Sequence, residues 1–240
     1  MEVPDVPAIC RAAKAKGVPV ALDNTWAAGL AFRAFEHGVD IVMQALTKYH
    51  SGGSDVLMGA VITRDRELHR KIELAHMRLG MGVSADDTYL VLRGLPTMKL
   101  RFDAHDAAAR KVAAWLKARP EIAKVLHPAF DDCPGHAIWQ RDFTGAGGLF
   151  SVLFDPKYTE EQTDRFIDSL KLFKIGYSWG GPMSLVMPYH MGSSRTRSVA
   201  HMQRGRVVRF CIGLEAVADL QADIVQALQA AKLPPSTSRG

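Results

Sequence analysis

Two short apolar runs, Val18–Leu22 and Asp40–Leu46, place the strongest constraint on the fold of this chain. The first run does not alternate polar and apolar residues, which is typical of a strand buried on both faces of a sheet. The second run is another apolar strand. The intervening residues, Ala27–His37, favour a helix that ends at Gly38. A strand–helix–strand unit of this length predicts two parallel neighbouring strands. We therefore expect an α/β fold with a mainly parallel sheet.

The rest of the chain divides into further expected helices and strands. Helices are expected at 8–16 behind an N-cap at Asp5, at 65–79, at 86–118 with an interruption near Pro96, at 160–172 and at 216–231. Strands are expected at 56–62, 122–126, 149–154 and 207–214. Strict alternation of strands and helices is lost beyond Pro120. We therefore expect residues 1–105 to belong to a large domain and residues 106–240 to form a smaller α+β domain.

The composition excludes several classes of protein. The 240 residues include 48% hydrophobic and 23% charged residues, which is ordinary for a globular chain. No stretch reaches the ~20 apolar residues of a membrane span, and the first residues lack a signal-peptide pattern, so we expect a cytoplasmic protein with no membrane partner. The net charge of +5 comes from scattered basic residues, which indicates no nucleic-acid partner.

Cysteine and histidine spacings predict no metal site. Cys10, Cys133 and Cys211 have no metal-type spacing, and we expect all three to be structural. His69 and His76 lie seven residues apart on an expected helix, but no third ligand has a matching spacing. We interpret them as a surface pair.

Two polar residues follow the first two expected strands. Asp23 comes directly after the first strand, and Lys48 comes just after the second. Ligands of open parallel sheets bind beyond the carboxyl ends of the strands, so this carboxylate and this amine should face one crevice. Taken alone, the pair is better explained as a simple salt bridge, because a lysine in a loop is usually just solvated.

Longer segments resemble a known family. The segments are LDNTWAAG at residues 22–29, QALTKY at 44–49, SD at 54–55, RGLPTM at 93–98, PGH at 134–136, FTGAGGLFS at 143–151, YSWGG at 177–181 and VRFCIGLE at 208–215. In this order they resemble the Cys/Met-metabolism family of pyridoxal-phosphate (PLP) enzymes. The YSWGG form resembles the bacterial cystathionine β-lyase branch, because the γ-synthase and γ-lyase branches generally have Ser-Leu-Gly-Gly there. Trp179 is therefore the residue that distinguishes the branches, and the alternative is that it is only an aromatic side chain of the core.

The resemblance implies an aspartate-aminotransferase-like fold of type I and a PLP cofactor. Lys48 would be the Schiff-base lysine, and Asp23 would keep the pyridine nitrogen protonated. Thr47 would give its hydroxyl to the phosphate, and Thr25 is a further cofactor-binding residue. For Thr47, a strand-end threonine bonded to backbone is the alternative.

A second set of residues is expected to bind the substrate. Arg209 lies in an apolar strand, where an unpaired charge would be costly. A guanidinium matched to a substrate carboxylate explains it, with a structural ion pair as the alternative. Ser178, Trp179 and Tyr177 would border the same carboxylate.

The implied reaction is β-elimination from a small amino-acid thioether. Cystathionine would give homocysteine, pyruvate and ammonia, as in methionine biosynthesis by transsulfuration. Other reactions of the family remain open, namely cystathionine γ-synthase, γ-lyase or cysteine desulfhydrase activity, as does an inactive fragment. The family also implies a homo-oligomer, as a dimer or tetramer.

Several positions depart from the family pattern. Gly53 stands where the family usually has His, Ala45 where members often have Ser, and Pro182 and Met183 replace an aromatic-Glu pair. We also expect the family's N-terminal segment, with its phosphate loop and ring-stacking Tyr, to be absent from this sequence. These departures leave the substrate choice and the activity of the chain open.

Overall fold

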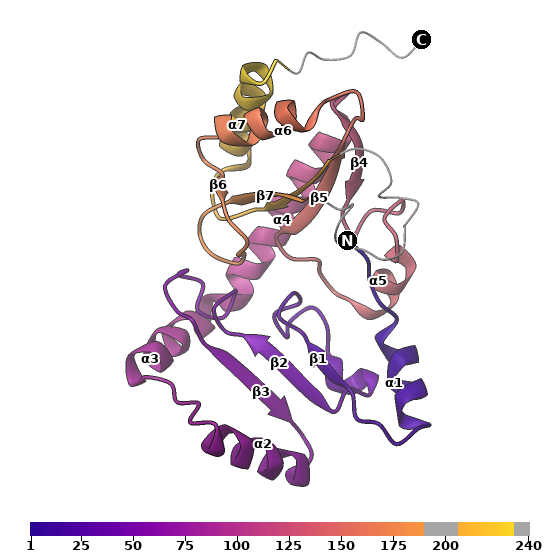
Figure 1. Cartoon of the computed structure of the whole chain (residues 1–240), viewed down its shortest axis with the longest axis vertical. Coiled ribbons are helices and arrows are strands. Elements are labelled where there is room, and N and C mark those ends of the chain that lie inside the picture. The colour runs from indigo at the N-terminus through magenta and orange to yellow at the C-terminus, as the bar shows by residue number, and fades with distance from the viewer. Residues whose placement is uncertain (190–205, 233–240) are drawn as a thin grey trace.

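The computed structural model describes residues 1–189 and 206–232. Figure 1 shows two sheets, one below the other, with the long helix α4 (Met98–Lys117) running diagonally between them. This mixed α/β architecture agrees with the fold class expected from the sequence. No helix in the described ranges combines the length and apolar character that crossing a bilayer requires.

The first sheet has the strand order β1-β2-β3, with β1 at Ala21–Asp23, β2 at Ile41–Ala45 and β3 at Gly59–Thr63. β1 and β2 are parallel, as predicted, whereas β3 pairs with β2 antiparallel. The expectation that the first strand is buried on both faces is wrong, because Ala21 and Asp23 are exposed. β1 forms an edge of this described sheet, so it has a neighbour on one side only.

The expectation of a helix between β1 and β2 is also wrong. Only a short 3₁₀-helix, η1 (Ala34–His37), forms there, and Gly38 ends it in the left-handed conformation. The cause lies upstream, where Ala28 and Gly29 have φ values of 55° and 68°. Two successive residues in the left-handed region cannot continue a right-handed helix.

Helices α1 (Val6–Lys14), α2 (Arg66–Arg78) and α3 (Ala85–Gly94) agree with the expected ranges to within a few residues. Asp5 caps α1 by accepting a hydrogen bond from the Ala8 N–H at 2.9 Å. The interruption near Pro96 is confirmed, since a 3₁₀-turn, η2 (Leu95–Thr97), separates α3 from α4.

The second sheet has the order β4-β5-β8-β7-β6. The predicted strands β4 (Ile122–Leu126), β5 (Leu149–Phe154) and β8 (Val207–Cys211) are confirmed, as are the helices α6 (Glu160–Ser169) and α7 (Val217–Ala230). Three elements were not expected from the sequence, namely α5 (His136–Asp142), β6 (Lys174–Ile175) and β7 (Leu185–Tyr189). β7 contains Pro188, which ordinarily argues against a strand. It is tolerated because β6 pairs only with Leu185 and Val186.

Helix α4 contributes to the cores on both sides of the molecule. Phe102 packs into the core around the first sheet, whereas Val112 and Leu116 pack into the core of the second sheet. The change falls between residues 102 and 109, within one continuous helix. We retain the division into residues 1–105 and 106–240 as a proposal, with α4 shared by the two units.

A buried carboxylate on α7 anchors the loop before β6. Asp223 is nearly fully buried and accepts hydrogen bonds from the backbone N–H groups of Lys171 and Leu172 at 2.9 and 2.8 Å. We expect Asp223→Ala to lower the free energy of unfolding by about 2 kcal/mol, because it leaves part-buried backbone donors without their acceptor. Urea unfolding measures this loss. The exposed Asp219 of the same helix is the control, and equal losses for both variants would contradict this role.

Candidate active site

The carboxyl ends of β1 and β2 carry the first part of the site. Asp23 is the last residue of β1, and its Oδ1 accepts hydrogen bonds from the Thr25 N–H at 2.9 Å and the Thr25 hydroxyl at 2.5 Å. The Thr25 hydroxyl in turn accepts from the Ala45 N–H at the end of β2, at 2.8 Å. Among the described residues, both hydrogen bonds to Asp23 end on Oδ1. Thr25 therefore orients the carboxylate, and Oδ2 is left to meet a ligand.

Lys48 lies in the turn that follows β2 and reaches the second half of the molecule. Its Nζ lies 2.8 Å from the Ser178 Oγ and 4.4 Å from the centre of the Trp179 ring. The pKa of Lys48 is lowered from the ordinary lysine value, first by burial and then by repulsion from Arg209. A larger fraction of this amine is therefore neutral near pH 8 than for a solvated lysine. In the described ranges, neither Lys48 nor Asp23 forms a salt bridge, so the simple ion pair does not explain them.

Arg209 occupies the middle of β8, a central strand of the second sheet. Its Nη2 donates to the Tyr177 carbonyl oxygen at 2.5 Å, and its guanidinium lies 5.8 and 5.5 Å from the rings of Trp179 and Tyr189. No described acidic side chain pairs with it. The structural ion pair is thus not found there, and a carboxylate ligand remains a good match for the fork of donors.

The YSWGG segment supplies two side chains and one carbonyl to this cluster. Ser178 and Trp179 face Lys48, whereas the Tyr177 side chain is exposed and contributes only its backbone oxygen to Arg209. The Trp179 ring lies 5.9 Å from the ring of Trp26, which follows Asp23 by three residues. The Trp179 Nε1 is buried without a hydrogen-bond partner among the described residues. Such an orphaned donor is unusual for a plain core aromatic.

Thr47 behaves differently from the expectation. Its hydroxyl donates to the Met58 carbonyl at 3.3 Å and accepts from the Met58 N–H at 3.1 Å. This backbone contact is the alternative that the sequence left open. A role at a phosphate therefore stays a proposal, and it requires the hydroxyl to change partners.

Two residues that hold the Lys48 turn were not expected from the sequence. Arg101 on α4 donates to the Tyr49 carbonyl at 2.7 Å and to the Gly94 carbonyl at 2.8 Å. Tyr49 is fully buried, and its hydroxyl accepts from the Gly148 N–H. Tyr49 could have been found from the sequence, because it adjoins Lys48 within QALTKY. Arg101 lies outside every segment of the family resemblance and gave none.

The residues of the candidate site differ in how well they suit a metal ion and a cofactor. No group of three or more His, Cys, Asp or Glu side chains in the described part of the chain could hold a metal ion. An aldehyde-bearing pyridine cofactor fits, because Lys48 offers an amine of lowered pKa and Asp23 offers a free carboxylate oxygen. Asp23 and Trp26 also border a cavity of about 420 Å³, within the range of ligand pockets. Lys48 is not part of its lining, so the cavity marks the Asp23 side of the site.

We expect Arg209→Gln to raise the pKa of Lys48, because it removes the repulsion while burial remains. Acetic anhydride modifies only the neutral amine, so Lys48 should be acetylated at higher pH in the variant. Peptide mass mapping across a pH series measures this, with the exposed Lys16 as the internal reference. The exposed Arg33→Gln is the matched control. A Lys48 profile that is unchanged by Arg209→Gln would show that the two cations do not interact.

Comparison with known proteins identifies what this arrangement is similar to. The family model described as "Cys/Met metabolism PLP-dependent enzyme" matches residues 1–229. The cystathionine beta-lyase of Escherichia coli is 41% identical over 230 residues, which cover 93% of this chain and 58% of that protein. Among solved structures, a cystathionine gamma synthase from Xanthomonas oryzae pv. oryzae, in complex with aminoacrylate and cysteine, has a TM-score of 0.86 at 31% identity, with coverage of 97% and 60%. A cystathionine gamma-lyase from Lactobacillus plantarum, complexed with L-serine, has a TM-score of 0.86 at 26% identity, with coverage of 96% and 61%.

Proposed function

Since this chain belongs to the Cys/Met-metabolism family of PLP-dependent enzymes, we propose that it carries the lysine, the aspartate and the carboxylate-binding arginine of a carbon–sulfur β-lyase. The proposed substrate is cystathionine, which with water gives homocysteine, pyruvate and ammonia, a step of methionine biosynthesis. The chain spans somewhat less than 60% of the curated relative from E. coli, so the activity of the whole protein is part of the proposal.

The observation that carries the proposal is the contact between Lys48 and Ser178. These residues are 130 positions apart, yet Nζ and Oγ lie 2.8 Å from each other, and the same Nζ lies over the Trp179 ring. An amine of lowered pKa thereby lies near the same Trp179 ring as the guanidinium of Arg209, which pairs with no acidic side chain in the described part of the chain. This arrangement supports proton abstraction next to an amino-acid carboxylate.

Each residue then has a defined task. PLP, when bound, supplies an aldehyde for amines and a ring that withdraws electrons from the substrate Cα. Lys48 and Asp23 would hold this cofactor, with Asp23 keeping a proton on its ring nitrogen. The neutral Lys48 amine would take the Cα proton, and Arg209 would bind the α-carboxylate through its open donors. Ser178 would orient the lysine amine, and Trp179 would exclude water from it.

Two observations favour the β-lyase over the γ-lyase and γ-synthase. Trp179 stands next to Lys48 and Arg209, at the position where the γ branches generally carry Leu. The E. coli relative with 41% identity is named a β-lyase. The keto acid decides between the lyases, because β-cleavage of cystathionine yields pyruvate whereas γ-cleavage yields 2-oxobutyrate.

The experiment has two stages. The protein is mixed with PLP and reduced with borohydride, and peptide mapping is expected to find the pyridoxyl group on Lys48. Cystathionine is then supplied, and pyruvate and a free thiol are expected. A label elsewhere, or none, would overturn the site and favour an inactive fragment. A label on Lys48 with 2-oxobutyrate, or with no keto acid, would overturn the β-lyase while the family chemistry remains.

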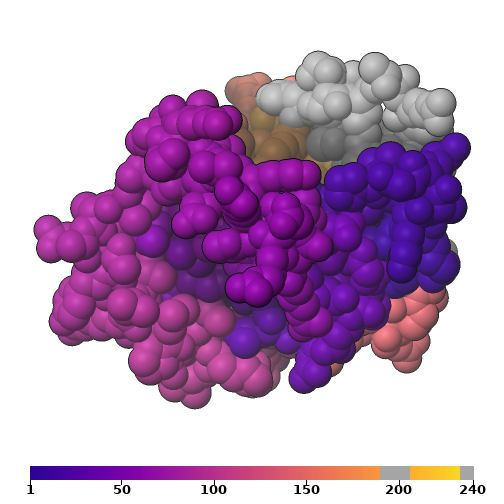
Figure 2. Space-filling view, turned by 90° about the horizontal axis from the view of Figure 1, so that it is seen from below, coloured from indigo at the N-terminus to yellow at the C-terminus, as the bar shows by residue number. Residues whose placement is uncertain are grey.

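We also propose a homo-oligomer and a cytoplasmic location. Figure 2, the view from below, shows the α2–α3 segment across much of that face. Apolar side chains are exposed along and after these helices, at Met77, Leu79, Met81, Val83, Tyr89, Leu92 and Leu100. A patch of this kind is typical of a protein–protein interface. Sedimentation should give a multiple of the 26.3 kDa chain mass.

The three cysteines are free and buried, which suits a reducing compartment.

A further inference from the structure

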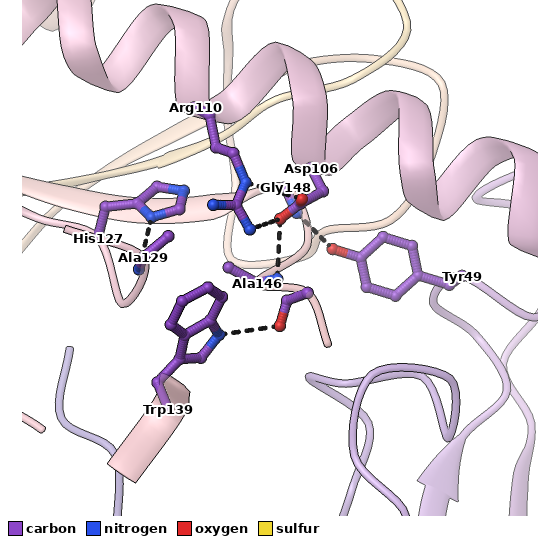
Figure 3. Close-up of polar contacts among 9 residues, drawn as sticks. Tyr49, Asp106, Arg110, His127, Ala129, Trp139, Ala146 and Gly148 are labelled. Carbon is purple, nitrogen blue, oxygen red and sulfur yellow. Dashed lines mark hydrogen bonds and ion pairs between the residues drawn. The ribbon is translucent and has the colours of Figure 1, made fainter. Parts of the chain in front are cut away.

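Tyr49 links the Lys48 turn to the second sheet. It follows Lys48 directly, and its side chain is fully buried. Its ring lies edge-on to Phe102 and His105 of α4, at centroid distances of 5.0 and 5.5 Å. Its hydroxyl accepts a hydrogen bond of 2.8 Å from the N–H of Gly148, the residue before β5. Figure 3 shows this side chain reaching under α4 toward Gly148.

Two glycines make the close approach to Tyr49 possible. A Cβ on Gly147 would lie 2.7 Å from the Tyr49 hydroxyl oxygen, and a Cβ on Gly180 would lie 2.8 Å from the Tyr49 backbone nitrogen. Both glycines also have positive φ, at 70° and 79°. Gly180 follows Ser178 and Trp179 in the chain. Tyr49 is therefore packed between the 145–148 loop and the loop that presents Ser178 to Lys48.

The 145–148 loop is held firmly on its other side. The Ala146 N–H donates to the Asp106 Oδ1 at 2.8 Å, and Asp106 is paired with Arg110 at 2.8 Å. The Trp139 Nε1 donates to the Gly145 carbonyl at 3.0 Å. These contacts fix the 145–148 loop to α4 and α5. The hydrogen bond between Gly148 and Tyr49 therefore ties the Lys48 turn to the second sheet.

We propose that Tyr49 is a positioning residue that sets the approach of the Lys48 amine to Ser178 by holding the 145–148 and 178–181 loops against the Lys48 turn. This inference rests on the proposed role of Lys48 and deepens it. Burial raises the pKa of the Tyr49 phenol, so the hydroxyl stays neutral and the contact does not titrate in the working range. A purely structural role would require only the buried ring.

The test removes the hydroxyl and keeps the ring. In Tyr49→Phe the Gly148 N–H loses its acceptor, so the 145–148 loop should loosen from the Lys48 turn. Water should then reach Lys48, and the contributions of burial and of Arg209 to its lowered pKa should weaken. The expected result is a shift of the Lys48 acetylation profile to higher pH, measured by peptide mapping with Lys16 as reference. Tyr89→Phe, at an exposed tyrosine of α3, is the matched control and should leave the profile in place. A Tyr49→Phe profile equal to the wild type overturns the proposal.

A double-mutant cycle identifies the route of the effect. If Tyr49 acts through the Lys48–Ser178 contact, Tyr49→Phe should shift the profile much less in a Ser178→Ala background than in the wild type. Full additivity overturns the proposal. Should circular dichroism show that Tyr49→Phe does not fold, Trp139→Phe replaces it. That variant releases the Gly145 carbonyl and should shift the profile in the same direction, and an unchanged profile again overturns the proposal.

These measurements are independent of the cofactor. Acetylation of Lys48 reports its protonation whether or not PLP binds. If borohydride trapping of the wild type fails, the proposed function falls, while the Tyr49 proposal is still decided by the acetylation profiles. If trapping succeeds and the profiles do not move, only the Tyr49 proposal falls.

Discussion

Lys48→Arg is expected to abolish borohydride labelling by PLP and to reduce pyruvate formation from cystathionine by at least about 10⁴-fold. Arginine keeps the positive charge beside Ser178 and over the Trp179 ring, so the fold should be retained. Its guanidinium does not lose a proton in proteins, so it can neither attach the aldehyde nor accept the Cα proton. Peptide mapping and a keto-acid assay measure the two losses.

The control for this variant is Lys16→Arg, because Lys16 is exposed beyond the end of α1. It should keep the full label on Lys48 and the full rate. Stoichiometric labelling of another lysine in Lys48→Arg would show that the Schiff-base residue had been misassigned. A melting temperature well below that of the wild type would instead show that Lys48 is needed for folding.

The part of the site that lies at strand ends could be predicted from the sequence. Asp23 and Lys48 each follow an apolar run, and the parallel pairing of the two strands brings their carboxyl ends to one edge of the sheet. That step needs only local patterns and one topological rule. The caps and breaks at Asp5 and Pro96 are local as well, and they are where the structure agrees with the expectation.

Long-range packing determined the parts that the sequence did not predict. The Tyr49–Gly148 contact joins residues 99 positions apart, and nothing in the local pattern around either residue indicates it. The helix expected after β1 fails at Ala28 and Gly29, although alanine favours helices, because tertiary context overrides a weak propensity. For Thr47 the sequence offered a backbone contact as the alternative but could not name its partner, Met58, which lies 11 positions further along the chain.

The site depends on contacts from three separate elements to one short turn. Arg101 on α4 holds the Tyr49 carbonyl, Gly148 before β5 holds the Tyr49 hydroxyl, and Ser178 meets the Lys48 amine. A lysine with the role proposed for Lys48 needs such support, because a loose lysine would regain water and its ordinary pKa. Substitutions around Tyr49 should therefore change the protonation of Lys48 more than they change the fold.

Asp23→Asn is expected to separate attachment of the cofactor from catalysis. Asparagine has nearly the same shape, and its Oδ1 can still accept the two hydrogen bonds from Thr25, so the turn after β1 should persist. Lys48 remains unchanged, so borohydride should still place the pyridoxyl group on it. The lost negative charge would no longer hold a proton on the ring nitrogen, and we expect pyruvate formation to fall by about 10²- to 10³-fold, mainly in kcat.

The pairing of these two readouts makes the Asp23 prediction specific. Asp103→Asn makes the same substitution at an exposed aspartate on α4 and should change neither the label on Lys48 nor the rate of pyruvate formation. Asp23→Ala should lose the rate as Asp23→Asn does, and should also destabilise the turn, because Thr25 loses its acceptor. If Asp23→Asn retains nearly full turnover, the Asp23 carboxylate is not what keeps the ring nitrogen of the cofactor protonated. If its label on Lys48 disappears as well, Asp23 is required to bind the cofactor, because electronic assistance after binding would leave the label intact.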